Sequence, residues 1–431
     1  MAPGQIPIAV SASAFSIVFA AFVFAALAWR TWLAVRQARH VAGHRDSVPA
    51  DFAAFISPEA HRKAADYTLD KLRLGLAETL VVDGAVLFAL TLGGGVALID
   101  AASQRAFGDG YLRNLGTVFG VLFATAVAAL PFDLWRTFVI EERHGFNRTT
   151  PRLFAIDLAK AVALSIALGT PLLLAVFWLV EAAGPLWWLY TWFAWIVFTI
   201  VMVMAFPRWI APLFNRFTPL EAGELRRRIE ALVERCGFHA QGLFVMDGSR
   251  RSSHGNAYFT GFGTQKRIVF FDTLLERLTP EEIEAVLAHE LGHFARGHIP
   301  RLLAVRFALA AGLLAILGWL YREPAFHQAL HLADPRIGAV LAGFALVVPV
   351  FTFPFQPLAS LIARRQEFEA DAFAARHASA TDLASALAKL YRDNASTLTP
   401  DPLHSLVYDS HPPAALRIDH LRRGRETPST I

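Results

Sequence analysis

Two histidines and a glutamate in the middle of this 431-residue sequence have the types and the spacing that zinc hydrolysis requires. His289 and His293 are four residues apart, so on a helix their imidazoles lie on one face and can reach the same Zn²⁺. Glu290 stands one step round, where its carboxylate can take a proton from a water molecule at the metal. The pentapeptide predicts one catalytic zinc ion per chain.

Local signals predict that this pentapeptide lies in the body of a helix. Thr279 is suited to the N-cap, Pro280 to the first helical position, and Glu282 to the third position of a capping box. Gly297 supplies a stop signal after the second histidine. The two imidazoles are therefore expected to project from a regular helical turn.

Two other histidine pairs have the same spacing without the glutamate. They are His40 with His44 and His327 with His331. Spacing alone is a weak signal for a metal site, so we do not expect either pair to bind one.

A catalytic zinc ion needs a third protein ligand. The extended HExxH-xx-G-xx-H pattern is excluded, because Arg296 and Ile299 stand where it requires glycine and histidine. Farther along, Glu367 and Asp371 share one helix face, and Glu369 points elsewhere. One of the pair can bind the metal while the other holds a ligand histidine, but the spacing alone fits a solvated acidic face equally well.

The elements around these residues are those of a membrane protein. The sequence is 55% hydrophobic and 18% charged, against about a quarter charged in soluble proteins. We read the net charge of +4 as that of basic membrane loops, so no nucleic acid is expected. Cys236 is the only cysteine, which rules out an intrachain disulfide and a cysteine-based zinc site. Apolar runs long enough to span a bilayer predict about seven membrane helices, at 6–29, 79–100, 114–135, 153–180, 185–206, 302–321 and 337–363.

We expect a mainly α-helical integral membrane fold with a small α+β, zincin-like catalytic insert. The insert contains an amphipathic stretch at 224–235 and strand-like runs at 242–246 and 267–271. The predicted units are helices one to five at 1–206, the insert at 207–301, helices six and seven at 302–363, and a C-terminal catalytic segment at 364–431.

The distribution of basic residues predicts the orientation. Arginines and lysines concentrate in the first and third loops, which places those loops in the cytoplasm, the N-terminus outside and the catalytic site on the cytoplasmic side. Asp83 and Asp133 fall inside predicted spans, so they should face other helices or a water-filled space. Pro349, Pro354 and Pro357 should kink the seventh helix on its way to Glu367.

The order and spacing of several short motifs resemble the type I CAAX prenyl protease family of seven-helix membrane zinc endopeptidases. The motifs are ERHGFN at 142–147, APLFN at 211–215, FTPL at 217–220, NAYF at 256–259, DTL at 272–274, HELGH at 289–293, EFEADA at 367–372 and SHPP at 410–413.

The resemblance implies roles for residues that the spacing left open. It makes Glu367 the third zinc ligand and Asp371 either the partner of a ligand histidine or a proton donor. It also places His411 and Arg417 at the active site, where they stabilise the oxyanion or orient the carbonyl.

A short segment of the insert matches the family's substrate-binding strand. The resemblance implies that Asn256, Ala257 and Tyr258 form an edge strand that holds the substrate main chain. An ordinary turn and strand is the alternative for these three residues.

Together these features predict a membrane zinc endopeptidase, and the resemblance implies removal of C-terminal tripeptides from prenylated proteins. The expected partners are a peptide or protein substrate, with or without a lipid, and the bilayer. Alternatives are a quality-control protease with non-prenylated substrates and, remotely, a metal-binding receptor or transporter without catalysis. The alanine- and arginine-rich composition favours a bacterial inner membrane over the endoplasmic reticulum.

Overall fold

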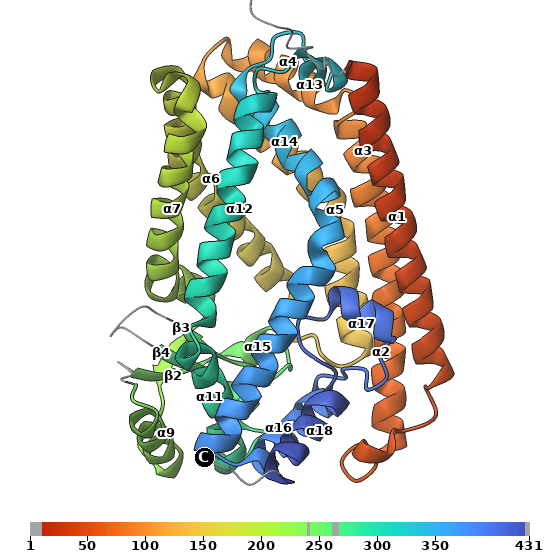
Figure 1. Ribbon diagram of the computed structural model, residues 1–431, viewed down its shortest axis with the longest axis vertical. Coiled ribbons are helices and arrows are strands. Elements are labelled where there is room, and N and C mark those ends of the chain that lie inside the picture. The colour runs from red at the N-terminus through yellow and green to blue at the C-terminus, as the bar shows by residue number, and fades with distance from the viewer. Residues whose placement is uncertain (1–10, 239–241, 261–266, 427–431) are drawn as a thin grey trace, which may run out of the picture.

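A computed structural model describes residues 11–238, 242–260 and 267–426 of the protein. Long helices stand roughly side by side, and a smaller part with short helices and a sheet lies across one end of them (Figure 1). The predicted mainly helical membrane fold is confirmed. Residues 6–10 of the first predicted span lie outside the described residues.

Six helical segments in the described residues are long and apolar enough to cross a membrane, and a bent pair supplies a seventh. The predicted runs are the apolar portions of longer helices. The six are α1 (Ala12–Gly43), α5 with the π-helix η3 (Tyr111–Trp135, Arg136–Glu141), α6 (Pro151–Ala182), η4 to α8 (Gly184–Leu186, Trp187–Ala205, Phe206–Ile210, Ala211–Phe214), α12 (His298–Leu320), and α14 with η7 and α15 (Ile337–Thr352, Phe353–Phe355, Gln356–His377).

The second predicted span, 79–100, is wrong as a single helix. The chain forms α2 (Pro58–Glu78), η2 (Thr79–Val86) and α3 (Leu87–Leu90), then turns by 58° into α4 (Gly95–Phe107). Gly94 has φ +76°, and a Cβ on Gly93 or Gly95 would lie within 3.0 Å of the backbone of the preceding turn. Only glycine fits this turn, whereas a hydropathy pattern reads the segment as continuous apolar sequence.

The seventh segment is interrupted where the prolines predicted a kink. α14 ends at Thr352, a short 3₁₀ turn covers Phe353–Phe355, and α15 begins at Gln356. Pro349 lies inside α14, and Pro354 and Pro357 flank the start of α15, so three backbone donors are missing from this stretch.

The part outside the spans contains the four-stranded sheet of the described residues, β1 (Phe217–Pro219), β2 (Gly242–Met246), β3 (Ala257–Thr260) and β4 (Arg267–Phe271), in the order β1-β2-β4-β3. β2 and β4 are parallel, and β3 pairs antiparallel with β4 at an edge. The helices here are α9 (Glu224–Arg235), α10 (Asp272–Leu275), α11 (Pro280–Ala295), α16 (Ala380–Asp393), α17 (Pro402–Tyr408) and α18 (Ala414–Glu426). The predicted α+β insert is confirmed.

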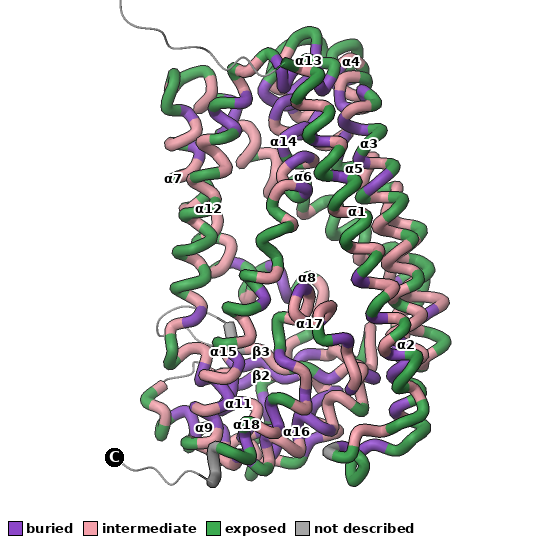
Figure 2. Tube along the Cα trace, turned by 45° about the vertical axis from the view of Figure 1, so that its right-hand side comes forward, coloured by how far each residue is buried: buried purple, intermediate pink, exposed green. Residues whose placement is uncertain are grey.

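The burial pattern separates the two parts of the molecule. Buried positions are dense in the catalytic end, whereas the long helices carry many exposed positions along their length (Figure 2). Large apolar side chains such as Phe123 and Trp209, each 71% exposed, lie on the long helices. Apolar side chains at such positions contact lipid in a membrane protein.

Candidate metal centre

Helix α11 is fixed at its start by the predicted capping box. The Thr279 side chain accepts from the backbone N–H of Glu282, and the Glu282 carboxylate accepts from the backbone N–H of Thr279 at 2.9 Å. The same carboxylate accepts from Ser385 at 2.6 Å and from Lys389 at 2.8 Å, which ties α11 to α16. Burial alone would raise the pKa of Glu282, but these hydrogen bonds outweigh it and lower the pKa below its ordinary value.

A glycine between the two histidines allows α15 to lie directly against α11. A Cβ on Gly292 would lie 2.9 Å from the Ala370 Cα and 3.1 Å from the Phe373 Cβ. Ordinary carbon–carbon contacts are about 3.5–4.0 Å, so only glycine permits this approach. The close packing brings the carboxylate that α15 carries to the imidazoles of α11.

His289, His293 and Glu367 form the one group of potential metal ligands among the described residues. Their nearest atoms are 3.3–3.4 Å apart: 3.3 Å between the two Nε2 atoms, 3.4 Å from His289 Nε2 to Glu367 Oε2, and 3.3 Å from His293 Nε2 to the other carboxylate oxygen, Oε1. Ligands about 2.0–2.1 Å from a tetrahedral ion are separated by roughly 3.3–3.4 Å. In addition, Glu367 Oε2 is buried without a hydrogen-bond partner in the described structure. The three residues therefore fit a zinc ion.

A buried ion pair holds the far side of His289. Its Nδ1 lies 2.8 Å from Asp371 Oδ1, and Arg417 donates to both Asp371 oxygens at 2.6 and 2.8 Å. Arg417 Nη1 is also 3.3 Å from Glu367 Oε2. Burial alone would lower the pKa of His289, but the hydrogen bonds to Asp371 and Glu367 raise it to about 9. The same carboxylates favour a cation at the Nε2 side.

His293 has a partner that sequence reasoning missed. Its Nδ1 lies 2.9 Å from His298 Nδ1, and His298 Nε2 lies 3.2 Å from Glu369 Oε2. His298 is 3% exposed. Gly297, with φ +66°, separates α11 from α12, so that His298 at the start of α12 lies next to His293. A histidine just after a predicted helix stop was the available signal. Metal-binding histidines commonly have such a partner on the second ring nitrogen.

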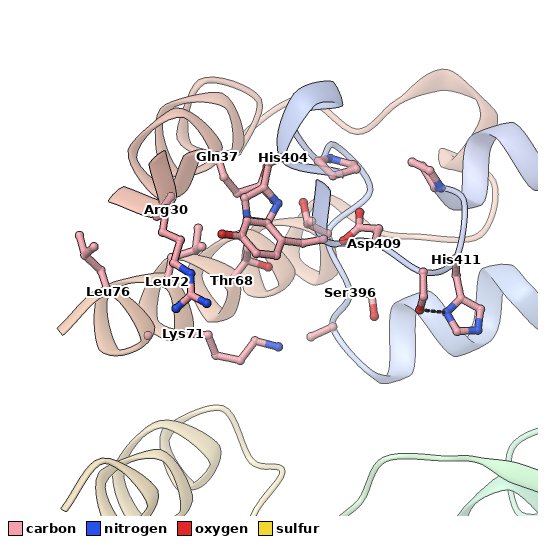
Figure 3. Close-up of a pocket in the computed structure, with 18 of the residues that line it drawn as sticks. Arg30, Gln37, Thr68, Lys71, Leu72, Leu76, Ser396, His404, Asp409 and His411 are labelled. Carbon is pink, nitrogen blue, oxygen red and sulfur yellow. Dashed lines mark hydrogen bonds between the residues drawn. The ribbon is translucent and has the colours of Figure 1, made fainter. Parts of the chain in front are cut away.

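Glu290 and His411 lie next to the ligands and are both at least partly exposed. Glu290 is half-buried, and within the described residues its carboxylate makes neither a hydrogen bond nor an ion pair. His411 has a side chain 63% exposed, with Nε2 3.5 Å from Glu367 Oε1 and Nδ1 3.0 Å from Ser410 Oγ. His411 lines a cavity of about 640 Å³ that also contains Arg30 and Lys71 on its opposite side (Figure 3). The accessible nitrogen and carboxylate can act on a bound substrate.

The predicted substrate strand corresponds to β3 and the residue before it. β3 is the edge of the sheet in the described residues and packs against α11. Asn256 is exposed and its side chain accepts from the backbone N–H of Ala257 at 2.8 Å. Tyr258 is half-buried. The outer edge of β3 can accept an extended peptide.

The other histidine pairs stay apart from this centre. Neither His40 with His44 nor His327 with His331 gains a third metal ligand in the described part of the chain. His44 and His331 instead lie within hydrogen-bond distance of backbone carbonyls, of His40 and of Leu92 respectively.

Two acidic residues within the spans are paired. Asp83 accepts from Arg30 of α1 at 2.7 Å, and Asp133 accepts from Arg136 of its own helical segment at 2.7 Å. Asp83 thus makes an interhelical contact, whereas the partner of Asp133 lies three residues along the same segment.

Known proteins resemble the whole chain. Residues 37–216 match the family described as CAAX prenyl protease N-terminal, five membrane helices, and residues 219–425 match peptidase family M48. The CAAX prenyl protease 1 homolog of Arabidopsis thaliana is 36% identical, over 92% of this chain and 95% of its own length. CAAX prenyl protease 1 of Saccharomyces cerevisiae is 32% identical over 94% of each chain.

A solved structure gives the same result for the fold. The crystal structure of S. mikatae Ste24p has a TM-score of 0.86 and 29% identity, and the match covers 94% of this chain and 98% of that one. With the metal centre in place and the similarity extending over nearly all of the sequence, the chain belongs to the M48 family of metallopeptidases, in its multi-pass membrane form with a CAAX prenyl protease N-terminal region.

Proposed function

We propose that this metallopeptidase holds one zinc ion on His289, His293 and Glu367 and hydrolyses peptide bonds near the cytoplasmic face of a membrane. The observation that carries the proposal is the 3.3–3.4 Å separation between the ligand atoms of the three residues, which matches the separation of ligands around a tetrahedral zinc ion. When bound, zinc supplies Lewis-acid activation of water and of the scissile carbonyl.

The remaining residues have separate tasks in this proposal. Glu290 takes the proton of the attacking water and returns it to the leaving amine. His411 donates from Nε2 to the carbonyl oxygen as negative charge develops there. Asp371 and Arg417 are positioning residues, because they are fully buried against each other and hold His289 through its Nδ1. We therefore assign Arg417 to the carboxylates rather than to the substrate oxyanion.

We propose that the substrate is a peptide chain end, bound as an added strand along β3 with Asn256, Ala257 and Tyr258 against its backbone. Proteins similar to this one are named CAAX prenyl proteases, and we extend that substrate class, a prenylated C-terminus, to this chain. The position of the site next to the membrane spans supports this assignment. The span α12 begins five residues after His293, and Glu367 lies on the helical segment that continues from the last span. A lipid held in the membrane would therefore keep its peptide near the zinc ligands.

The decisive experiment compares three variants of the purified protein. Glu290→Gln should keep its zinc content and lose hydrolysis of a quenched peptide by about 10²- to 10⁴-fold, the usual contribution of a general base. His289→Ala and Glu367→Ala should lose zinc as well as hydrolysis. Undiminished hydrolysis by Glu290→Gln would refute the mechanism.

The single cysteine allows a direct test of the proposed orientation. Cys236 follows α9 in the catalytic part and is half-buried. A membrane-impermeant maleimide should label it in inside-out vesicles and not in intact cells until detergent is added. Cys236→Ser is the control for labelling elsewhere, and labelling of intact cells would reverse the orientation.

A further inference from the structure

The cavity beside His411 is lined by parts of the chain that are far apart in sequence. α1 and α2 line it on one side, and the segment from Tyr391 to Pro413 lines it on the other (Figure 3). Its volume of about 640 Å³ is within the usual range for a bound small molecule or short peptide, roughly 300–1,000 Å³. The end of a peptide chain fits a space of this size.

One cation in this cavity makes no direct ion pair with a described carboxylate. Arg30 is paired with Asp83 at 2.7 Å. Lys71, by contrast, makes no ion pair with any described carboxylate, and its Nζ lies 4.1 Å from the centroid of the Tyr67 ring. The Glu141 carboxylate acts on Lys71 electrostatically without a direct contact, and it accepts a hydrogen bond from the Tyr67 hydroxyl.

The Lys71 side chain extends across the cavity toward the segment that carries Ser396, and His411 lies beyond that segment (Figure 3). Asp409 is the one carboxylate among the lining residues, and it lies near His404, away from the Lys71 amine. An ammonium group that lines a cavity and makes no direct ion pair can bind a negatively charged ligand.

We propose that Lys71 binds the C-terminal carboxylate of the substrate and thereby selects peptide ends over internal segments. This inference rests on the proposed function. With the scissile bond at His411, the departing residues extend into the cavity, and three extended residues reach roughly 10 Å. Lys71 then sets how many residues lie between the cleaved bond and the chain end.

The test uses three peptides with one shared cleavage site: one ends in a free carboxylate, one in a carboxamide, and one in a carboxamide preceded by glutamate. The parent protein should prefer the free carboxylate, and Lys71→Gln should reduce kcat/KM for that peptide by about 10- to 100-fold, mostly through KM, as expected for loss of a hydrogen bond to a charged group. Lys71→Arg should retain most of the preference.

Arg73→Gln is the matched control. Arg73 lies two residues on, with a side chain 78% exposed and an ion pair to Asp70, and it is not among the cavity residues. It should leave the ranking of the three peptides unchanged. If the parent protein cleaves the glutamate peptide with the same kcat/KM as the free-carboxylate peptide, Lys71 binds any acidic group rather than the chain end. That result overturns the selection of peptide ends.

Equal kcat/KM for acid and amide in the parent protein overturns the inference without any variant. If no peptide is cleaved, the proposed function fails. The carboxylate site is then judged by binding of the acid and amide peptides to Glu290→Gln, measured by fluorescence anisotropy. Equal affinity of the two peptides would overturn it, and tighter binding of the acid would support it.

Discussion

Replacing Gly292 with alanine should weaken the metal centre although no ligand is changed. The added Cβ would lie 2.9 Å from Ala370 Cα and 3.1 Å from the Ala370 carbonyl oxygen. These are backbone atoms of α15, so no side-chain rotation can relieve the contact. The helix that carries Glu367 must move away from the helix that carries His289 and His293.

The size of that movement follows from the contact distances. To reach an ordinary carbon–carbon separation of about 3.5–4.0 Å, α15 must shift by roughly 0.6–1 Å. Metal–ligand distances tolerate about 0.2 Å, so the Glu367 carboxylate would leave bonding distance of an ion held by the two imidazoles. Overpacking at such a site also costs about 1–3 kcal/mol of folding free energy.

The assay is zinc retention against a competing chelator, together with thermal unfolding in detergent. Gly292→Ala should release zinc at least about tenfold more readily, as when the surroundings of a metal ligand are disturbed, and unfold several degrees lower. Gly312→Ala in α12 is the control, because a Cβ there meets nothing within 4 Å. Zinc retention by Gly292→Ala equal to that of the parent would refute the idea that this glycine sets the position of Glu367.

Three further predictions concern the residues around the ligands. Asp371→Asn should lower zinc affinity about 10- to 100-fold in the chelator assay, because it removes the anion that holds His289; unchanged affinity would contradict this role. His298→Ala should also weaken zinc binding, since His293 loses its Nδ1 partner, and a normal thermal unfolding profile would separate this effect from misfolding. The depressed pKa of Glu282 means that its ionised form stabilises the fold above the unfolded-state pKa of about 4.3 and that this stabilisation is lost as pH falls through the lower, folded-state pKa. Thermal stability of the parent should therefore fall more steeply than that of Glu282→Gln upon acidification from pH 6, and parallel curves would refute this.

Local rules in the sequence were sufficient for the element that carries the chemistry. The N-cap Thr279 and the acidic residue three positions later satisfy backbone donors within one turn, so their effect does not depend on distant residues. The helical spacing of His289 and His293 then follows directly. Glu367 required the family resemblance, because an acidic helix face has the same spacing whether it binds a metal or water.

The features that were missed depend on packing or on backbone conformation. The turn at Gly94 interrupts an apolar run, and hydropathy does not register a reversal of direction. Helix α2 begins at Pro58, well before the predicted start at residue 79, because its first turns are polar and a hydropathy pattern does not include them. His298 follows the predicted helix stop and does not fit the extended zinc motif, yet it lies beside His293 because α11 ends before Gly297.

Membrane helices that continue beyond their apolar runs bring residues far apart in sequence together at the metal centre. α15 continues from the last span to His377 and carries Glu367 into the catalytic part, where Ser360 donates to the Val407 carbonyl oxygen at 2.8 Å. α12 enters the membrane directly after His298. Two of the elements that set the ligand positions are thus continuous with candidate membrane spans. Gly292 allows the direct contact between α11 and α15, because a Cβ at this position would lie 2.9 Å from the Ala370 Cα.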